Sequence, residues 1–463
     1  MQRFACMRAR EPSTAGPGRR RAVRAAAFAA SLFGCHQTQN PGSAADAATR
    51  TADAASDSLI AVDAAPADAL LLADGADGAA PAAGRVLYPE GQLQSPITQD
   101  LANRLAAIAG QDNEAVFAKI GDSMTATTSF VACFGSPGFD LGAHTDLAGS
   151  LAYFQSGDAG GATPYARVST AATGGWTTSD VLTGAPAALD GELAAIHPRY
   201  GAVLLGTNDV RTGRTVDAFG TDLWNIVDNM LATGTIPIMS TLPAMHGDPE
   251  SNAHIPLFNR VIRAIAQGRS IPLVDFGLAL SSLANEGISA DGIHPTISPD
   301  GACALTSSGL AYGYNVRNLL TLEALDRSHR ARSGQAMDAT APRRVGSGTH
   351  ADPFRGPLPL VDLADTRSGE SLFSAYPACG LTASGHEIVY RLDLGAATAI
   401  DAVVVDRGGV DVDVAILAGS LDPTSCVATG DRGASATVGP GAVFIVVDSR
   451  APTSEGEFLL VVQ

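Results

Sequence analysis

Between residues 98 and 276 the chain alternates segments of helical apolar periodicity with short, continuous apolar runs. The helical segments are 98–109, 187–196, 216–232 and 257–267, and the apolar runs are 115–120, 202–205, 236–240 and 271–276. Such alternation predicts a parallel sheet flanked by helices, with a last helix from residue 299 to about 325. The region 88–328 is therefore expected to form one α/β domain around a single core.

Beyond residue 357 the period of the apolar pattern changes to two. Apolar and charged residues alternate at 387–394 and 411–416, and apolar runs follow at 443–447 and 458–462. This pattern is typical of antiparallel strands, so residues 358–463 are expected to form a small all-β sandwich of accessory function. Asp411 and Asp413 are potential calcium ligands, but an exposed strand face is the favoured interpretation.

Two stretches show neither helical periodicity nor strand-like alternation. Residues 35–87 are rich in alanine, aspartate, glycine and proline and have little to bury, which predicts a disordered tether. Residues 329–357 are rich in arginine, serine and glycine and are expected to link the two domains.

Small polar clusters come directly after two of the apolar runs. Gly121-Asp122-Ser123 follows the run 115–120, and Gly206-Thr207-Asn208-Asp209 follows the run 202–205. The carboxyl ends of parallel strands meet at one edge of a sheet, where α/β enzymes carry their chemistry. Ser123 is therefore the best candidate nucleophile, with Asp122 as a structural residue, although each cluster alone also suits an ordinary turn.

A carboxylate and a histidine stand close together in Asp291-Gly-Ile-His294-Pro. At this spacing Asp291 can reach one ring nitrogen of His294 while the other nitrogen faces a serine. A solvated loop and a pair of metal ligands are the alternatives. The presence of the Ser123 and Asn208 blocks in the same sequence argues against both. His246 and His254 are interpreted as surface residues, with substrate contact as the alternative.

A further block, Gly174-Gly175-Trp176-Thr177-Thr178-Ser179, is a glycine turn whose hydroxyls are expected to cap a helix beginning near Val181. Together the four blocks, carrying Ser123, Gly175, Asn208, and Asp291 with His294, resemble those of the SGNH, or GDSL, hydrolases. The resemblance covers roughly residues 88–328. The sequence contains no Gly-x-Ser-x-Gly nucleophile elbow of the ordinary α/β-hydrolase kind.

The resemblance implies a flavodoxin-like sheet and a role for each residue. Ser123 would be the nucleophile, His294 the general base, and Asp291 the group that orients His294. The N–H groups of Ser123 and Gly175 and the side-chain amide of Asn208 would form the oxyanion hole. Gly175 is the least secure assignment, because its neighbour is also glycine.

The implied reaction is hydrolysis of a carboxylic ester, without a cofactor or a metal. Short acyl esters or carbohydrate O-acetyl esters are the expected substrates, and a lysophospholipase or a thioesterase is the alternative within enzymes. The competing class is a surface lipoprotein that binds a ligand on a hydrolase fold without catalysis. Residues 358–463 faintly resemble the pre-peptidase C-terminal sandwich of secreted bacterial enzymes, in composition and strand layout.

The N-terminus indicates export. Arginines at 19, 20, 21 and 24 precede the apolar run 25–34, which has the form of a signal peptide and is too short for a transmembrane helix. Leu32 and Gly34 before Cys35 resemble a bacterial lipobox, which implies removal of residues 1–34 and lipid attachment to Cys35. The expected location is the bacterial cell envelope, with the lipid as the only membrane contact; a plain secretory signal and a soluble secreted protein are the alternative.

The charge balance argues against a nucleic-acid partner. The whole chain has a formal net charge of −17 and a single lysine, Lys119. Loss of residues 1–34 removes seven arginines and one glutamate, which leaves a net charge of −23. The sequence does not indicate an oligomeric state.

Besides the lipidated Cys35, four cysteines would remain in the mature chain, which agrees with export. Cys133 lies ten residues after the candidate nucleophile and Cys303 nine after the candidate base, so both are expected on segments leaving the site. Cys379 and Cys426 both lie in the C-terminal region. The favoured disulfides are Cys133–Cys303 and Cys379–Cys426, with free buried thiols as the alternative.

Overall fold

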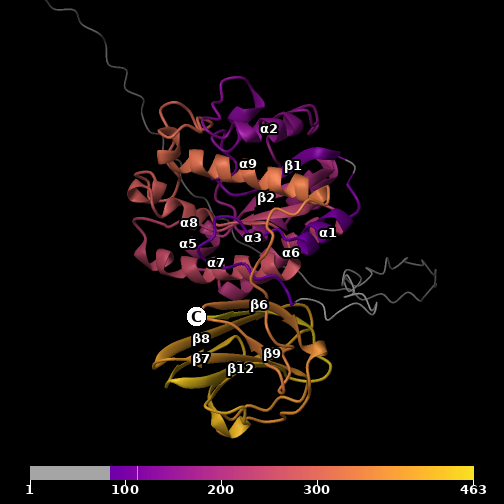
Figure 1. Ribbon diagram of the computed structural model, residues 1–463, viewed down its shortest axis with the longest axis vertical. Coiled ribbons are helices and arrows are strands. Elements are labelled where there is room, and N and C mark those ends of the chain that lie inside the picture. Colours follow the sequence, from indigo (N-terminus) through magenta and orange to yellow (C-terminus); the bar gives the residue numbers. More distant parts are fainter. Residues whose placement is uncertain (1–83, 112) are drawn as a thin grey trace, which may run out of the picture. The chain divides into compact units, whose positions relative to one another are not determined.

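The computed structural model describes residues 84–111 and 113–463 (Figure 1). The expected signal peptide, the lipidation residue Cys35 and all but the end of the expected tether lie outside these residues. An α/β domain comes first along the described chain, and an all-β sandwich follows it. Among the described residues, no helix has the length and apolar character needed to cross a membrane.

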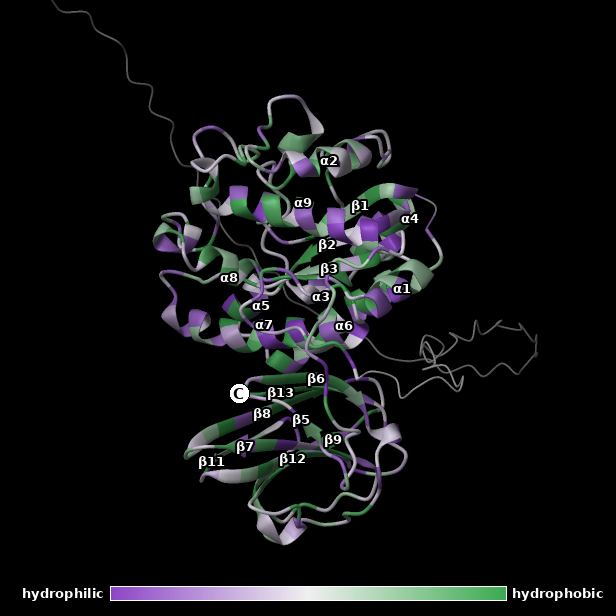
Figure 2. Cartoon of the chain, viewed as in Figure 1, coloured by the Kyte–Doolittle hydropathy of each residue, from purple (hydrophilic) through white to green (hydrophobic). Residues whose placement is uncertain are grey.

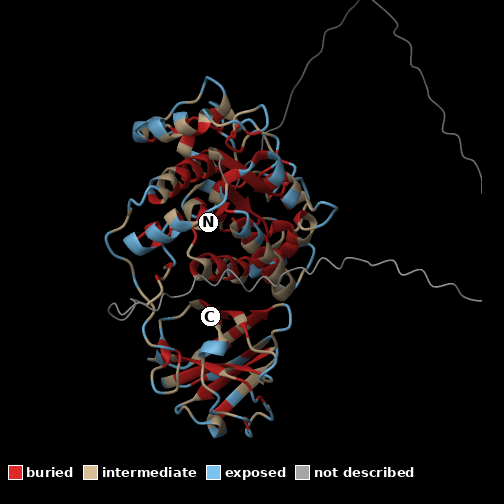
Figure 3. Cartoon of the chain, turned by 90° about the vertical axis from the view of Figure 1, so that its right-hand side faces the viewer, coloured by how far each residue is buried: buried red, intermediate tan, exposed pale blue. Residues whose placement is uncertain are grey.

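The α/β domain contains a parallel sheet of strand order β1-β2-β3-β4, as the alternating pattern predicts. Strands β1 (Asn113–Gly121), β2 (Pro198–Leu204) and β3 (Ile236–Ser240) lie where three of the four apolar runs were. All of β2 is buried, as expected of a central strand covered on both faces. Figure 3 shows buried residues concentrated in the interior of the α/β domain. Strand β4 spans only Leu273–Val274, shorter than the expected 271–276, because Asp275 caps a helix that begins at the next residue.

Helices flank this sheet. The longer ones are α1 (Gln99–Ala107), α2 (Ala148–Gln155), α4 (Ala188–Ile196), α6 (Val216–Ala232), α7 (Pro249–Arg269) and α9 (Gly313–Arg332). The shorter ones are α3 (Thr178–Val181), α5 (Thr207–Arg211) and α8 (Phe276–Leu280), with 3-10 turns η2 (Ala132–Gly135), η3 (Thr145–Leu147), η4 (Ala284–Gly287) and η5 (Gly309–Ala311).

Three helices differ from the sequence-based expectation. Helix α7 begins before residue 257, because Asp248 caps its first turn and Pro249 is tolerated there. Helix α9 begins at residue 313 and not at 299, because Gly301, at φ +97°, lies in a left-handed turn that no helix can include. Helix α3 begins at residue 178, where Thr177 and Asp180 form a capping box, and already ends at Val181.

Two sheets form the sandwich, with strand orders β10-β9-β12-β7-β5 and β11-β8-β13-β6. The four regions of predicted strand character are β7 (Glu387–Leu394), β9 (Val412–Ala418), β12 (Gly441–Ser449) and β13 (Glu457–Val462). The remaining strands are β5 (Phe354–Arg355), β6 (Leu360–Asp365), β8 (Thr398–Asp406), β10 (Cys426–Gly430) and β11 (Gly433–Val438), with 3-10 turns η6 (Thr366–Ser368) and η7 (Pro423–Ser425). All pairings between these strands are antiparallel except that of β5 with β7.

The exposed-face interpretation of Asp413 is wrong, since this residue is only 3 % exposed. Asp413 lies on the face of β9 that the segment before β7 covers, and not on a solvated surface. No group of three or more histidine, cysteine, aspartate or glutamate residues in the described chain is placed to hold a metal ion.

One hydrophobic core joins the two regions. Four apolar residues of the sandwich, Leu363, Val405, Leu459 and Val461, belong to the same buried cluster as the core of the α/β domain. They come from β6, β8 and β13, which pack against α6 and α7. Hydrophobic positions follow the strands of the one sheet, β11-β8-β13-β6, that packs against these helices (Figure 2). The described residues accordingly fall into one compact unit.

Polar contacts reinforce this junction. Arg269 on α7 binds Asp228 at 2.7 Å and Glu457 of β13 at 2.6 Å. The guanidinium of Arg407 stacks 4.0 Å from the ring centroid of Trp224 on α6. At Gly268 a Cβ atom would lie 2.3 Å from the Cβ of Leu363, so only glycine permits this approach.

Both expected disulfides are confirmed. Cys133 is bonded to Cys303 across 170 residues of sequence, and Cys379 to Cys426 across 47. The first links two loops of the α/β domain, and the second lies within the sandwich.

Candidate active site

The structure brings Ser123, His294 and Asp291 together at the carboxyl end of β1. Ser123 is half-buried in the turn that follows this strand, and its Oγ lies 2.8 Å from Nε2 of His294. Nδ1 of His294 lies 2.7 Å from Oδ2 of Asp291. The three side chains therefore form one continuous hydrogen-bonded chain from hydroxyl to carboxylate.

Local hydrogen bonds keep Asp291 ionised. Burial by itself would raise the pKa of the Asp291 carboxyl, but the N–H groups of Ile293 and His294 and the Ser289 hydroxyl donate to it. Their combined effect, with the bond to the His294 ring, holds this pKa well below its usual range. The carboxylate can thus stabilise a positive charge that forms on His294.

The glycine turn, Gly174-Gly175, lies beside Ser123 because the segment just before it pairs with the end of β1. The N–H of Gly121 donates to Ala171, and the N–H of Thr173 donates back to Gly121. Gly174 follows directly, and a Cβ there would lie 3.7 Å from the Cβ of Ser123. Gly175 adopts φ +85°, a conformation that favours glycine.

Two backbone donors are left free at this point. Among the described residues, no acceptor takes the N–H of Ser123 or of Gly175. Free N–H groups beside a candidate nucleophile are what an oxyanion hole requires.

Asn208 lies at the start of α5 and is 6 % exposed. Its Nδ2 donates to the carbonyl of Trp176 at 3.0 Å and lies 3.5 Å from Oδ2 of Asp122. Arg211 donates to its Oδ1 at 3.3 Å, which fixes the orientation of the amide. One N–H of the amide thus has only a long contact and is available to a ligand.

Asp122 is fully buried beneath the site. Burial raises the pKa of its carboxyl to about 6, although the N–H of Met124 and the nearby charge of Arg317 oppose this shift. Its Oδ1 accepts from Met124 at 2.9 Å, within the same turn as the nucleophile. This contact agrees with the structural role expected for Asp122.

Residues 119–298, which include all five expected site residues, match the model of the GDSL-like lipase/acylhydrolase family. This part of the chain belongs to that family. The protein is accordingly an ester-hydrolysing enzyme of the SGNH type.

Several solved structures are similar to the chain over about half of its length. A GDSL-like lipase from Bacteroides thetaiotaomicron is 17 % identical, with 49 % of this chain and 96 % of that one covered and a TM-score of 0.31. A putative acylhydrolase from Bacteroides fragilis is 21 % identical, with 50 % and 97 % covered and a TM-score of 0.31. An acetylxylan esterase from Geobacillus stearothermophilus is 18 % identical, with 47 % and 95 % covered and a TM-score of 0.32. No curated protein matches the chain.

A buried arginine supports the turn that carries Ser123. Arg317 on α9 donates to the carbonyl of Met124 and, at 2.9 Å, to Oγ1 of Thr125. Its guanidinium lies 3.8 Å from the ring centroid of Phe130. Burial lowers its pKa to about 10, so it remains charged at neutral pH. The sequence does not indicate this role, because nothing near residue 317 points to a partner in the Ser123 turn.

A second buried carboxylate joins two blocks of the GDSL-like hydrolase. Asp209 is fully buried and accepts from the N–H and the hydroxyl of Thr178, the latter at 2.6 Å. Arg214 pairs with the same carboxylate at 3.2 Å. The helix that follows the glycine turn is thereby fixed to helix α5, which carries Asn208.

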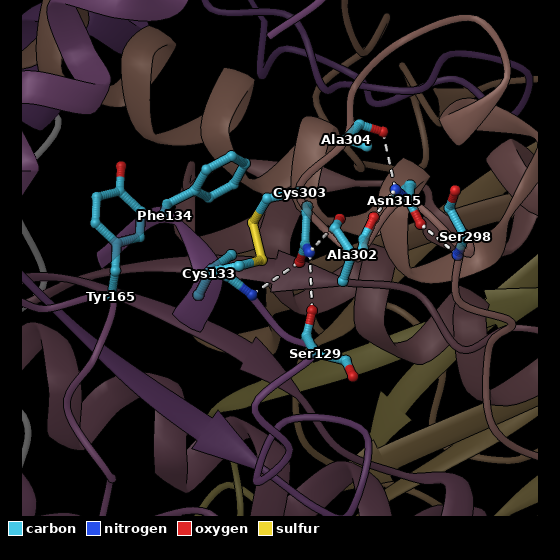
Figure 4. The surroundings of a disulfide bond; sticks show 12 residues. Ser129, Cys133, Phe134, Tyr165, Ser298, Ala302, Cys303, Ala304 and Asn315 are labelled. Carbon is cyan, nitrogen blue, oxygen red and sulfur yellow. Dashed lines mark hydrogen bonds between the residues drawn. A yellow bond between two sulfur atoms is a disulfide. The ribbon is translucent and has the colours of Figure 1, made fainter. Parts of the chain in front are cut away.

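Helix α9 also fastens the loops that the first disulfide joins (Figure 4). Asn315 donates to Ala304 at 2.9 Å, next to Cys303. Asn318 donates to both Ser129 and Ala302, at 2.8 and 3.0 Å. The segment that follows Ser123 and the segment that follows His294 are therefore linked both covalently and by hydrogen bonds.

His246, expected at the surface, contacts the loop that carries His294. Its ring lies 2.9 Å from a carboxylate oxygen of Glu286, and its N–H donates to the carbonyl of Gly292 at 2.7 Å. His254 is exposed on α7.

A cavity of about 500 Å³ opens beside Ser123. Its lining residues are Ser123, Thr127, Ser129, Ser289, His294, Pro295, Thr296, Ile297, Tyr312 and Tyr314. Ser123 and His294 line it, whereas Gly174 and Gly175 of the glycine turn do not.

Proposed function

We propose that the protein hydrolyses small carboxylic esters with Ser123 as nucleophile, His294 as general base and Asp291 as the group that orients His294. The observation that carries this proposal is the unbroken contact from Oγ of Ser123 through the His294 ring to Asp291, with distances of 2.8 and 2.7 Å. Short acyl esters and O-acetyl esters of carbohydrates are the substrates that we infer.

In the first half of the reaction, Nε2 of His294 takes the proton of the Ser123 hydroxyl as Oγ attacks the ester carbonyl carbon. The carbonyl oxygen gains a negative charge. His294 then gives its proton to the oxygen of the departing alcohol, and the acyl group stays on Ser123. In the second half, His294 takes a proton from water, water attacks the acyl group, and Ser123 recovers its hydrogen as the acid leaves.

The negative oxygen would receive the N–H groups of Ser123 and Gly175 and the amide of Asn208. Support comes from the free state of both backbone donors and from the long 3.5 Å contact of the Asn208 amide. Each donor of this kind contributes about 3 kcal/mol to lowering the barrier. Asn208→Ala should therefore reduce kcat about a hundredfold.

The decisive experiment replaces the nucleophile. Ser123→Ala should lose nearly all hydrolysis of 4-nitrophenyl acetate and should no longer react with a fluorophosphonate probe, while its circular dichroism stays native. Ser420→Ala, which changes an exposed serine of the sandwich, is the matched control and should behave as the parent. A folded Ser123→Ala variant that retains activity would refute the assignment.

We further propose that the enzyme is exported and anchored by a lipid on Cys35. The arginines before the run 25–34 and the Leu32 to Cys35 motif support this proposal. In a bacterial host, Cys35→Ser should abolish incorporation of labelled palmitate and release the protein from the membrane fraction. An unmutated protein that carries no lipid would instead favour a plain secretory signal.

A further inference from the structure

We infer that the cavity beside His294 binds the alcohol part of the ester, and that it selects an uncharged alcohol with several hydroxyl groups, such as a sugar. This inference rests on the proposed function and adds the specificity of the same site. Thr127, Ser129 and Tyr312 are the residues that we assign to this selection.

The position of the base decides which part of the ester occupies the cavity. His294 must give its proton to the oxygen of the departing alcohol, so this oxygen must lie within hydrogen-bond reach of Nε2. His294 and Ser123 line the cavity, whereas Gly174, Gly175 and Asn208 do not. Two of the three candidate oxyanion donors, Gly175 and Asn208, are thus absent from the lining, and the side of the ester that faces the base is the side that enters the cavity.

Free hydroxyl groups line this cavity. Within the described chain, no hydrogen-bond partner meets the side-chain hydroxyl of Ser129 or Tyr312. Oγ1 of Thr127 accepts the N–H of Ser129 at 3.2 Å and keeps its own proton to donate. Three half-buried hydroxyls that both donate and accept match an alcohol rich in hydroxyl groups better than a hydrocarbon chain.

The lining carries no fixed charge. Among its residues in the described chain there is no lysine, arginine, aspartate or glutamate, and His294 is the only titratable group besides two tyrosines. A phosphate or a quaternary ammonium group on the alcohol would therefore have no countercharge here. Ile297, 48 % exposed, and Pro295 add apolar surface against which the C–H face of a sugar ring can pack.

Paired substrates with one acyl group test this inference. The probes are methyl β-D-xyloside monoacetate and ethyl acetate, which differ only in the alcohol, and 4-nitrophenyl acetate, which reports the chemical step. We expect the parent to give a kcat/KM for the sugar acetate about tenfold or more above that for ethyl acetate, since hydrogen bonds in a half-buried site each contribute about fivefold to tenfold.

The variants remove hydroxyls without removing bulk. Tyr312→Phe combined with Ser129→Ala should lower the ratio of kcat/KM for the sugar acetate to that for 4-nitrophenyl acetate about tenfold, mainly through a higher KM for the sugar acetate. Tyr153→Phe, a tyrosine stacked on His329 that does not line the cavity, is the matched control and should keep the parent ratio.

Each remaining outcome overturns the inference. An unchanged ratio in the double variant, or a parent that does not distinguish the sugar acetate from ethyl acetate, would mean that the cavity does not select the alcohol. A kcat/KM that rises along 4-nitrophenyl esters from acetate to octanoate and that the double variant increases would assign the cavity to the acyl chain. A folded parent inactive on every ester would refute the proposed function as well, which separates the two failures.

Discussion

The α/β domain and the sandwich both bury carboxylates, but the hydrogen-bond partners of these carboxylates differ between the two regions. In the α/β domain, Asp209 is paired with Thr178 and Arg214, and the buried Glu192 accepts from Arg167 and Thr170. In the sandwich, Glu387, Asp413 and Asp448 occupy directly paired positions of β7, β9 and β12. Each of these three has a buried oxygen without a partner in the described chain, and no carboxylate of the described α/β domain does.

This difference has a direct electrostatic consequence. Burial, together with the negative charges of Glu387 and Asp413, raises the pKa of Asp448 to about 8, although the Tyr376 hydroxyl donates to it at 2.8 Å. The sandwich therefore binds a proton that an unfolded chain would release near pH 4. The ion pairs of Asp209 and Glu192 fix the geometry of the α/β domain, whereas the raised pKa of Asp448 makes the stability of the sandwich depend on pH.

The largest effect should come from separating the two regions. A chain that ends at Leu325 lacks the last turns of α9 and exposes the apolar surface of α6 and α7 that β6, β8 and β13 cover. We expect this chain to aggregate or to lose its cooperative unfolding, as measured by size-exclusion chromatography and circular dichroism beside the full chain. A monomeric, active product would show that the α/β domain is self-sufficient despite the shared core.

Next in size is the contribution of the disulfides. By the loop lengths of 170 and 47 residues, removal of Cys133–Cys303 should destabilise by about 5 kcal/mol and removal of Cys379–Cys426 by about 4 kcal/mol. Paired Cys→Ser variants compared by urea unfolding measure the two values. A larger loss for the sandwich pair would contradict the loop-length argument.

Arg317 tests the role of paired charge at the site. Arg317→Met leaves the carbonyl of Met124 and the buried Asp122 without their cation, so the nucleophile turn should shift and kcat should fall about tenfold to a hundredfold. KM should change little, since the residue does not line the cavity. Arg317→Lys, which keeps the charge, should recover part of kcat. Equal losses in both variants with a raised KM would point to general unfolding.

The smallest effect concerns pH. Because the folded pKa of Asp448 is raised above the unfolded value, stability from this group is complete below about pH 4 and declines as pH rises toward 8. Asp448→Asn should flatten the dependence of the melting temperature on pH over this interval. Asp393→Asn, at an exposed position of the same sheet, is the control and should keep the parent slope. Identical slopes in all three proteins would exclude the buried carboxylates as its cause.

Sequence patterns predicted contacts between residues that are close in the sequence and missed contacts between residues that are far apart in it. The Ser123 and Asn208 blocks lie at the carboxyl end of the sheet because each polar tip closely follows its strand in the sequence. Asp291 meets His294 because it lies three positions before it, whereas the contact of His294 with Ser123 was expected from the resemblance of the four blocks and not from a local pattern. The contact of Arg317 with Met124 has no such local signal, because it depends on how α9 crosses the domain.

The same limit applies to the secondary structure. Strands β7, β9, β12 and β13 were indicated by alternation or by apolar runs, whereas β10 and β11 consist largely of small and polar residues. The start of α9 was misplaced because a turn, in which the N–H of Gly301 donates to Ser298, interrupts the chain before the helix. The burial of Asp413 was missed because the segment that covers it lies before β7 in the sequence.

The cavity beside His294 also bears on the fate of the acyl-enzyme. Once the first product departs, the vacated space adjoins the base at Nε2, so the attacking water must arrive through it. A second alcohol that fills this space would compete with water for the acyl group. The same architecture that confers selectivity in hydrolysis would then permit transesterification, in which the enzyme moves an acetyl group from one hydroxyl compound to another.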